Sequence, residues 1–366
     1  MRIVLKLGTS TLTHPTGNLN IRRVEELCKV CSDLKNAGHE LVLVSSGAVA
    51  MGVGKLSLAE RPKDIPGKQA AAAVGQCELM YIYDKLYSQY HHVVAQLLIT
   101  ADDIETPERA QNFQNTLTRL LQLGTLPIIN ENDTVATQEL GIGDNDTLAG
   151  MLASITDSRL TVILTTEQGL RERNEDGTLG KRISVVKELS ESVRAMAGGT
   201  DNSEFSIGGM SSKLHAAEIV TAAGEYLWIA DGREKGALEK VLAGEDIGTV
   251  FLPRARRIPG RKRWISFFSR VSGSLLVDEG AAKAVREQGR SLLPSGVKFV
   301  SGAFKRGDTV EISGPDGVPF ARGLVNFDAA DCLQICGRGS AQVHTILGPN
   351  VDEEVIHRDN LTLNIP

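Results

Sequence analysis

Short aliphatic runs alternate with longer segments of mixed polar and apolar residues over the first 250 positions of the chain. The aliphatic runs have the length and the branched side chains of buried strands; they lie at 2–7, 41–44, 92–100, 125–130, 160–166 and 226–230. The segments between them predict helices over 21–37, 68–87, 108–123, 147–156 and 215–224. Because such alternation needs crossover connections, the pattern predicts an α/β fold with a three-layer, doubly wound, mostly parallel sheet.

The pattern changes after position 252. "PRARRIPGRKRW" contains six basic residues and two prolines, which predicts a basic, solvated linker over 253–270. Beyond it, short apolar runs are broken by Gly and Asp turns, with a hairpin signal at Pro315-Asp316-Gly317. We therefore predict one large domain over 1–252 and a small β-rich domain over 271–366.

Composition limits the class of protein. The chain has 366 residues, 23% of them charged, and a net charge of -5, so the whole molecule is not built to hold nucleic acid. The sequence contains no apolar run of the length that spans a membrane, and its start does not resemble a signal peptide. Five cysteines, an odd number, favour a reducing compartment. For the pair Cys28 and Cys31, buried thiols are favoured over a zinc site, because no His lies at finger spacing.

Three glycine-containing loops are candidates for phosphate contacts. They are "KLGTST" with Lys6, "SSGAVAMG", and "SIGGMSSK" with Lys213 before a predicted helix. Glycine lets backbone N–H groups approach an oxyanion closely, and a helix N-terminus adds positive partial charge. None of the three matches the P-loop pattern, so we expect a phosphate site of another type at the carboxyl ends of the strands.

Two polar clusters, "NEND" at 130–133 and "GIGDNDTLAG" at 141–150, have more than one interpretation. Alone, each is typical of a surface turn. Beside lysine-bearing loops, the carboxylates at 133, 144 and 146 could instead orient lysines, a substrate amine or a magnesium ion. The small residues of "KQAAAAVGQ" fit either a segment passing close to the substrate or a packed helix face.

Several of these motifs together resemble the amino-acid kinase family. The similar segments are "VLKLGTS", "VSSGAVAMG", "LPIINENDTVA", "IGDND" and "GGMSSKL". Within the family they are most similar to the glutamate 5-kinases, and "RKRWI", "VDEGA" and "VIHRDN" resemble the C-terminal PUA domain of those enzymes. The resemblance covers nearly the whole chain, and it identifies 271–366 as a PUA domain.

The resemblance implies a role for each matching residue. Lys6 and Lys213 would contact the transferring phosphoryl group, and Asp146 would hold both lysines in place. The residues that would surround glutamate are Ser46, Asn130, Asp133, Asp144 and Asn145. The residues that would bind the nucleotide are Lys6, Gly8, Thr9, Thr165, Thr166, Ile207, Gly208, Gly209, Met210, Ser211, Ser212 and Lys213. No protein ligand for a metal is implied.

The implied reaction is phosphorylation of the γ-carboxylate of L-glutamate by ATP with Mg²⁺, which gives L-glutamyl 5-phosphate in the first step of proline biosynthesis. A glutamate carboxylate, with a pKa near 4.3, is already ionised at neutral pH and needs no general base. The reaction instead requires two anions to be brought together, which suits two lysines. The resemblance also implies a cytoplasmic homo-oligomer, a dimer or tetramer, that proline inhibits.

The chain departs from the family pattern on the nucleotide side. Thr166 stands where the family usually has Asp, Arg171 where it has Tyr, and Ile207 where it has Thr. Two of these departures, Thr166 and Ile207, leave an alternative, a degenerate kinase that acts as a regulatory subunit. The PUA domain leaves another, an RNA-binding protein.

Overall fold

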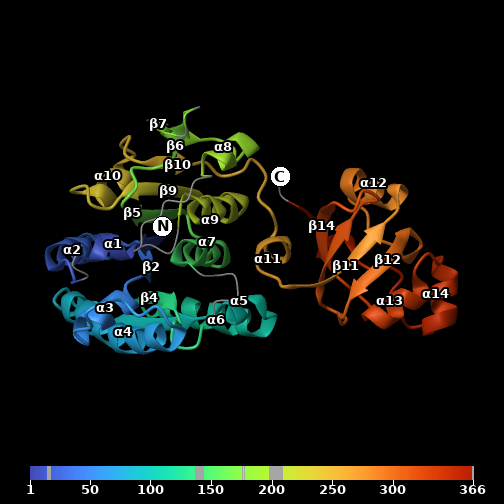
Figure 1. Ribbon diagram of the computed structural model, residues 1–366, viewed down its shortest axis with the longest axis horizontal. Coiled ribbons are helices and arrows are strands. Elements are labelled where there is room, and N and C mark those ends of the chain that lie inside the picture. Colours follow the sequence, from blue (N-terminus) through green and yellow to red (C-terminus); the bar gives the residue numbers. More distant parts are fainter. Residues whose placement is uncertain (15–17, 137–143, 175, 177, 198–208, 365–366) are drawn as a thin grey trace. The chain divides into compact units, whose positions relative to one another are not determined.

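The structure is a computed structural model that describes residues 1–14, 18–136, 144–174, 176, 178–197 and 209–364. The chain divides into two compact units, 1–257 and 258–366 (Figure 1). The range 253–270, predicted to be a linker, contains the helix α11 (Gly260–Phe267). The boundaries expected from the sequence, at 252 and 270, remain a prediction.

The first unit is built on an eight-stranded sheet with the order β3-β4-β2-β1-β5-β9-β10-β8. Its strands are β1 (Arg2–Leu7), β2 (Glu40–Ser45), β3 (Val94–Ile99), β4 (Leu126–Glu131), β5 (Leu160–Thr165), β8 (Val185–Val186), β9 (Tyr226–Asp231) and β10 (Thr249–Phe251). All neighbouring pairs are parallel except β9 and β10. The prediction of a mostly parallel, doubly wound sheet is therefore confirmed.

Helices cover both faces of this sheet. In the first unit they are α1 (Thr9–Leu12), α2 (Ile21–Asn36), α3 (Ala48–Lys55), α4 (Ile65–Ser88), α5 (Ala101–Glu105), α6 (Pro107–Gln122), α7 (Asn145–Thr156), α8 (Glu191–Met196), α9 (Met210–Ala222) and α10 (Ala237–Ala243). Figure 1 shows α2 and α10 on one side of the strands and α7 and α9 on the other. A two-stranded hairpin of β6 (Arg171–Arg173) and β7 (Leu179–Arg182) completes the unit.

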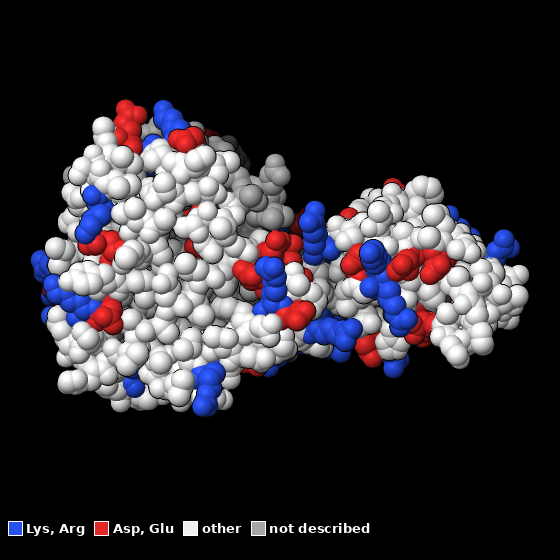
Figure 2. Space-filling view, turned by 90° about the horizontal axis from the view of Figure 1, so that it is seen from below, with Lys and Arg blue, Asp and Glu red and all other residues white. Residues whose placement is uncertain are grey.

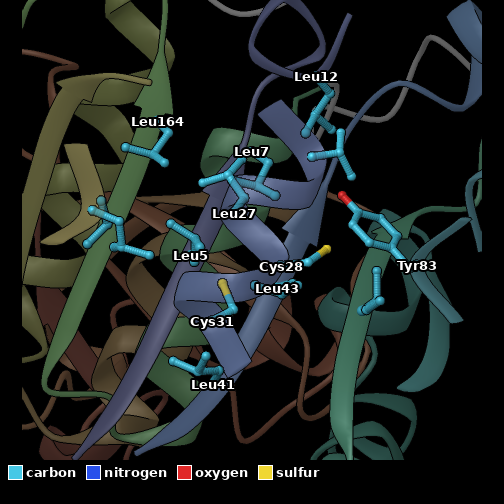
Figure 3. Close-up of a cluster of buried hydrophobic side chains, with 14 of the residues drawn as sticks. Leu5, Leu7, Leu12, Leu27, Cys28, Cys31, Leu41, Leu43, Tyr83 and Leu164 are labelled. Atoms are coloured by element: carbon cyan, nitrogen blue, oxygen red, sulfur yellow. The ribbon is translucent and has the colours of Figure 1, made fainter. Parts of the chain in front are cut away.

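Successive side chains of β1 point to opposite faces of the sheet. Leu5 and Leu7 join Cys28 and Cys31 of α2 in a buried cluster (Figure 3). Burial raises the pKa of both thiols to about 12, so they remain protonated core residues. Lys6 points to the opposite face because successive strand residues alternate. On that face α7 packs against β1, which brings Lys6 to the start of α7.

The helices α3 and α4 pack with their backbones in contact. A Cβ atom on Gly52 would lie 1.8 Å from the carbonyl oxygen of Ala71, and one on Gly75 would lie 1.8 Å from that of Ala48. Glycine is therefore required at both positions. Because Ala71 and Ala72 are buried at this contact, the alanine run supports the packed-helix interpretation rather than direct approach to a ligand.

The second unit has its own five-stranded sheet, with the order β12-β11-β13-β14-β15. Its strands are β11 (Val271–Val277), β12 (Val297–Gly302), β13 (Thr309–Ser313), β14 (Pro319–Leu324) and β15 (Leu361–Leu363). Its helices are α11, α12 (Glu279–Gln288), α13 (Ala329–Ile335), α14 (Ser340–Leu347) and the 3₁₀ turns η1 (Pro294–Gly296) and η2 (Arg358–Asn360). A buried apolar cluster lies within this unit. The predicted hairpin joins β13 to β14, with Gly317 at φ +74°.

Two further observations concern the surface and the helices. On the face drawn in Figure 2, Lys and Arg side chains are interspersed with Asp and Glu rather than gathered on one side. Among the described residues, no helix is both long enough and apolar enough to cross a membrane.

Candidate active site

The carboxyl ends of β1, β2, β4 and β5 meet at a cleft of about 240 Å³. This edge is where parallel sheets bind ligands. The cleft brings together most of the site residues predicted from the sequence. Those that line it are Lys6, Gly8, Thr9, Ser46, Asn130, Asp133, Asp144, Asn145, Thr165, Thr166, Gly209, Met210 and Lys213.

Two lysines share one buried carboxylate beside the cleft. Lys6 Nζ lies 2.6 Å from Asp146 Oδ1, and Lys213 Nζ donates a hydrogen bond of 3.0 Å to Asp146 Oδ2. Asp146 is 1% exposed, Lys6 7% and Lys213 4%. Burial by itself raises the pKa of the carboxyl, but the charges and hydrogen bonds of the two lysines outweigh it and lower the pKa. The group therefore carries two positive charges against one negative charge.

Secondary structure places these three side chains. Lys6 is the penultimate residue of β1, Asp146 is in the first turn of α7, and Lys213 is in the first turn of α9. The N-termini of α7 and α9 carry positive partial charge. The lysines and the two helix ends together make an environment that favours an anion.

A second set of predicted residues forms a chain of amide and hydroxyl groups. Asn145 Nδ2 donates to Ser46 Oγ at 2.8 Å and to Asn130 Oδ1 at 2.9 Å. Asn130 is 2% exposed at the end of β4. These three residues come from β4, from the start of α7 and from the loop before α3, so only the tertiary structure brings them together.

Asp144 lines the cleft and also stabilises the start of a helix. It is the N-cap of α7, and its Oδ1 accepts a hydrogen bond of 2.7 Å from the backbone N–H of Thr147. This cap begins the helix at Asn145, two residues before the predicted start. This cap was not predicted, although an Asp three residues before a helical N–H is its usual signature in a sequence.

Three charged residues of the cleft, Arg61, Glu131 and Glu167, were not predicted from the sequence. Burial, followed by the charges of Asp133 and Asp144, raises the pKa of Glu131 to about 7. Burial likewise raises the pKa of Asp133, against the opposing charge of Arg61. Within the described part of the chain, Arg61 makes no hydrogen bond or ion pair. Glu131 could have been found from its place in "NEND", whereas Arg61 lies in a loop with no motif.

Eight of the residues predicted to bind the nucleotide line the cleft: Lys6, Gly8, Thr9, Thr165, Thr166, Gly209, Met210 and Lys213. The carbonyl of Thr166 accepts a hydrogen bond of 2.7 Å from Arg233. Ser212 Oγ lies 2.9 Å from the carbonyl oxygen of Gly209 and 3.4 Å from Asp146 Oδ2. Ser211 and Ser212 are not among the described residues that line the cleft. The predicted residues Ile207 and Gly208 lie outside the described residues.

The described residues contain no group of three or more His, Cys, Asp or Glu side chains arranged to hold a metal ion. The acidic side chain nearest the lysines, Asp146, is already engaged with both of them.

Comparison with known proteins identifies two sequence families. A model of the amino acid kinase family matches residues 1–231, and a model of the PUA domain matches residues 273–347. A glutamate 5-kinase from Moorella thermoacetica is 46% identical over 98% of this chain and 95% of its own length. The glutamate 5-kinase of Caldanaerobacter subterraneus is 45% identical over 99% of this chain and 98% of its own length.

A solved structure supports the fold of the first unit. Carbamate kinase from Giardia lamblia, bound to AMP-PNP, superposes with a TM-score of 0.50 at 17% identity. The superposition covers 69% of this chain and 98% of the carbamate kinase. At 17% identity, this similarity supports the fold of the first unit and carries no information about its substrate.

Proposed function

The chain belongs to the amino acid kinase family and, within it, to the glutamate 5-kinases with a C-terminal PUA domain, and on this premise we propose how it acts. It is a phosphotransferase with a carboxyl group as acceptor. It transfers the γ-phosphoryl group of ATP to the γ-carboxylate of L-glutamate. The product is L-glutamyl 5-phosphate, in the first step of proline biosynthesis.

The observation that carries this proposal is the group formed by Lys6, Asp146 and Lys213. Phosphoryl transfer between two anions is limited by charge repulsion and by alignment rather than by proton removal. Two lysines at 2.6 and 3.0 Å from one buried carboxylate are held in fixed positions before the substrates arrive. Such preorganised positive charge stabilises the transferring phosphoryl group without a cost of reorganisation during the reaction.

The charged side chains of Arg61, Glu131 and Asp133 in the cleft suit the amino-acid end of glutamate. Arg61 is a partner for the α-carboxylate, while Glu131 and Asp133 are partners for the α-ammonium. Ser46 and Asn145 add neutral hydrogen-bonding groups to the cleft. With the lysines at the other end, the γ-carboxylate points toward the nucleotide.

We place the nucleotide across Gly8, Thr9, Thr165, Thr166 and the start of α9. Of the twelve residues that the sequence analysis assigned to it, Ile207 and Gly208 lie outside the described residues. Mg²⁺ fits as an ion carried mainly by the phosphates, since a protein cage of three or more acidic or His ligands is not present among the described residues. When bound, the ion neutralises charge on the phosphate oxygens.

Regulation and assembly are further parts of the proposal. Proline acts as a feedback inhibitor, and the enzyme is a cytoplasmic homo-oligomer, a dimer or a tetramer. A nucleic-acid partner is disfavoured because the chain has a net charge of -5 and mixed charges on the face drawn in Figure 2.

The test is a coupled assay of ADP release by the full-length chain with ATP and Mg²⁺. Glutamate, N-acetylglutamate, aspartate and UMP are compared as acceptors, each with and without proline. Release that depends on glutamate and is inhibited by proline is expected. Equal release with UMP or N-acetylglutamate contradicts the acceptor, and no release with any acceptor supports a degenerate, regulatory protein.

A further inference from the structure

Gln76 lies on α4, is 7% exposed, and is not among the described residues that line the cleft. Its Oε1 accepts a hydrogen bond of 3.0 Å from Asn130 Nδ2. Asn130 in turn is bonded to Asn145, which is bonded to Ser46. Gln76 is therefore the buried end of a chain of amides whose other end lies in the cleft.

The orientation of every amide in this chain follows from one backbone group. The N–H of Glu131 lies 2.9 Å from Asn130 Oδ1, and a backbone N–H can only donate. The Oδ1 of Asn130 must therefore face Glu131, so its Nδ2 faces Gln76, which must present Oε1. Asn145 must then offer Nδ2 to Asn130, and its Oδ1 remains a buried acceptor without a partner among the described residues.

The helix α4 holds Gln76 in a fixed position. The preceding residue, Gly75, packs directly against the backbone of Ala48, at the start of α3. Two turns along α4, the hydroxyl of Tyr83 lies 2.8 Å from Ser45 Oγ, at the end of β2. The same helix thus supports the loop that carries Ser46 and, through Gln76, the amide of Asn130.

We infer that Gln76 is a positioning residue for the amino-acid substrate, acting through Asn130 on the amide of Asn145. This inference rests on the proposed function. Without an acceptor at Gln76, the Asn130 Nδ2 group is left buried and unpaired, which is costly. Asn130 then turns to find another partner, and Asn145 loses the contact that aims its Oδ1. An oriented acceptor of that kind suits the α-ammonium of glutamate.

The experiment compares Gln76→Met, Gln76→Glu and Leu79→Ala in the full-length enzyme. Methionine keeps the shape and removes the acceptor, whereas the Glu side chain keeps an oxygen that can accept from Asn130. Leu79 lies on the same helix, is 2% exposed and belongs to the apolar core cluster, so Leu79→Ala controls for lost stability. The KM for glutamate, the KM for ATP, kcat and Tm are measured for each.

Gln76→Met is expected to raise the KM for glutamate by about tenfold, which is the scale of one well-placed hydrogen bond, with little change in the KM for ATP. Gln76→Glu should keep the KM for glutamate close to that of the unmodified enzyme, and Leu79→Ala should lower Tm without a selective change in that KM. In an Asn130→Ala background, Gln76→Met should add nothing further, because the residue acts through Asn130.

Three outcomes overturn the inference alone: an unchanged KM for glutamate in Gln76→Met, equal impairment by Gln76→Glu, or additive effects with Asn130→Ala. Each of them leaves glutamate-dependent ADP release by the unmodified enzyme intact. If the unmodified enzyme shows no such release, the proposed function fails, and the inference fails with it.

Discussion

Lys6 at the end of β1 and Asp146 in the first turn of α7 form a buried ion pair, with 2.6 Å between Nζ and Oδ1. The pairing is possible because Lys6 points to the face of the sheet that α7 covers. Asp146 also binds Lys213 of α9, so one carboxylate connects the central strand with two helices. The same three side chains thus connect these elements and supply the charge proposed for catalysis.

We predict that Asp146→Asn destabilises the first unit by about 3–5 kcal/mol, because it leaves buried lysines without their counter-ion. Chemical denaturation at neutral pH measures this loss. The carboxylate, whose pKa is lowered in the folded chain, stabilises it above the ordinary pKa of Asp, and that contribution is lost as the pH falls toward the lowered pKa. The difference between the two proteins should therefore shrink in acid.

A matched control for this prediction is Glu26→Gln, which removes the exposed ion pair with Arg22. That change should alter stability by less than about 1 kcal/mol, since exposed pairs contribute little. Equal losses of stability for Asp146→Asn and Glu26→Gln would show that the buried carboxylate contributes no more to stability than an exposed one.

Lys6→Ala and Lys213→Ala should each lower kcat by about two orders of magnitude or more, because each lysine acts on charge that develops during transfer. The fold should survive each change, as the remaining lysine still pairs with Asp146. Steady-state kinetics with circular dichroism as a check on folding measure this. Turnover near that of the unmodified enzyme in either variant argues against the proposed roles.

Asp133→Ala and Arg61→Ala should raise the KM for glutamate while leaving kcat much less affected, since both groups bind the non-reacting end. Arg61 can be tested more sharply with the α-amide of glutamate, which lacks the charged α-carboxylate. The unmodified enzyme should prefer glutamate, and Arg61→Ala should lose much of that preference. An unchanged preference would remove Arg61 from the substrate site.

The binding of glutamate should strengthen as the pH rises through about 7, the value to which burial and neighbouring acids raise the pKa of Glu131. Below that pH the carboxyl is neutral and attracts the α-ammonium weakly. Between the ordinary pKa of Glu and about 7, the folded chain also holds a proton that the unfolded chain has lost, so stability falls as the pH rises there.

The measurement for this prediction is the KM for glutamate and the free energy of unfolding, each as a function of pH. Glu131→Gln should flatten both profiles between pH 5 and 8, which brackets the raised pKa of about 7. The charged groups that act on Glu131 are Asp133 and Asp144, and Arg61 acts in turn on Asp133. A step that persists in Glu131→Gln would assign the titration to another group.

Gly75→Ala should destabilise the first unit and weaken glutamate binding, because the new Cβ atom would lie 1.8 Å from the carbonyl oxygen of Ala48. In an open helix the same change usually adds about 1 kcal/mol of stability. Gly54→Ala in α3 is the matched control, since its nearest atom lies at an ordinary 3.5 Å. Equal behaviour of the two variants would contradict the close packing.

Much of the fold followed from local patterns. The aliphatic runs and the segments between them determine strands and helices through side-chain period alone, so the parallel sheet of the first unit was predictable. The errors lie at boundaries and in short elements. The start of α7 was placed two residues late because the cap at Asp144 was overlooked, and the helices α13 and α14 of the second unit were not predicted.

The strand–helix order, the family, and the motifs that contain Lys6, Asn130, Asp146 and Lys213 could all be predicted from the sequence alone. Each of those features depends on residues that are close together in the sequence. The pairing of Asp146 with both lysines and the hydrogen bond from Asn130 to Gln76 became visible only in the folded chain. The tertiary structure alone also placed Arg61 in the cleft. The reason is physical: a contact between distant residues depends on strand order and helix packing, and a single sequence does not give either at atomic distance.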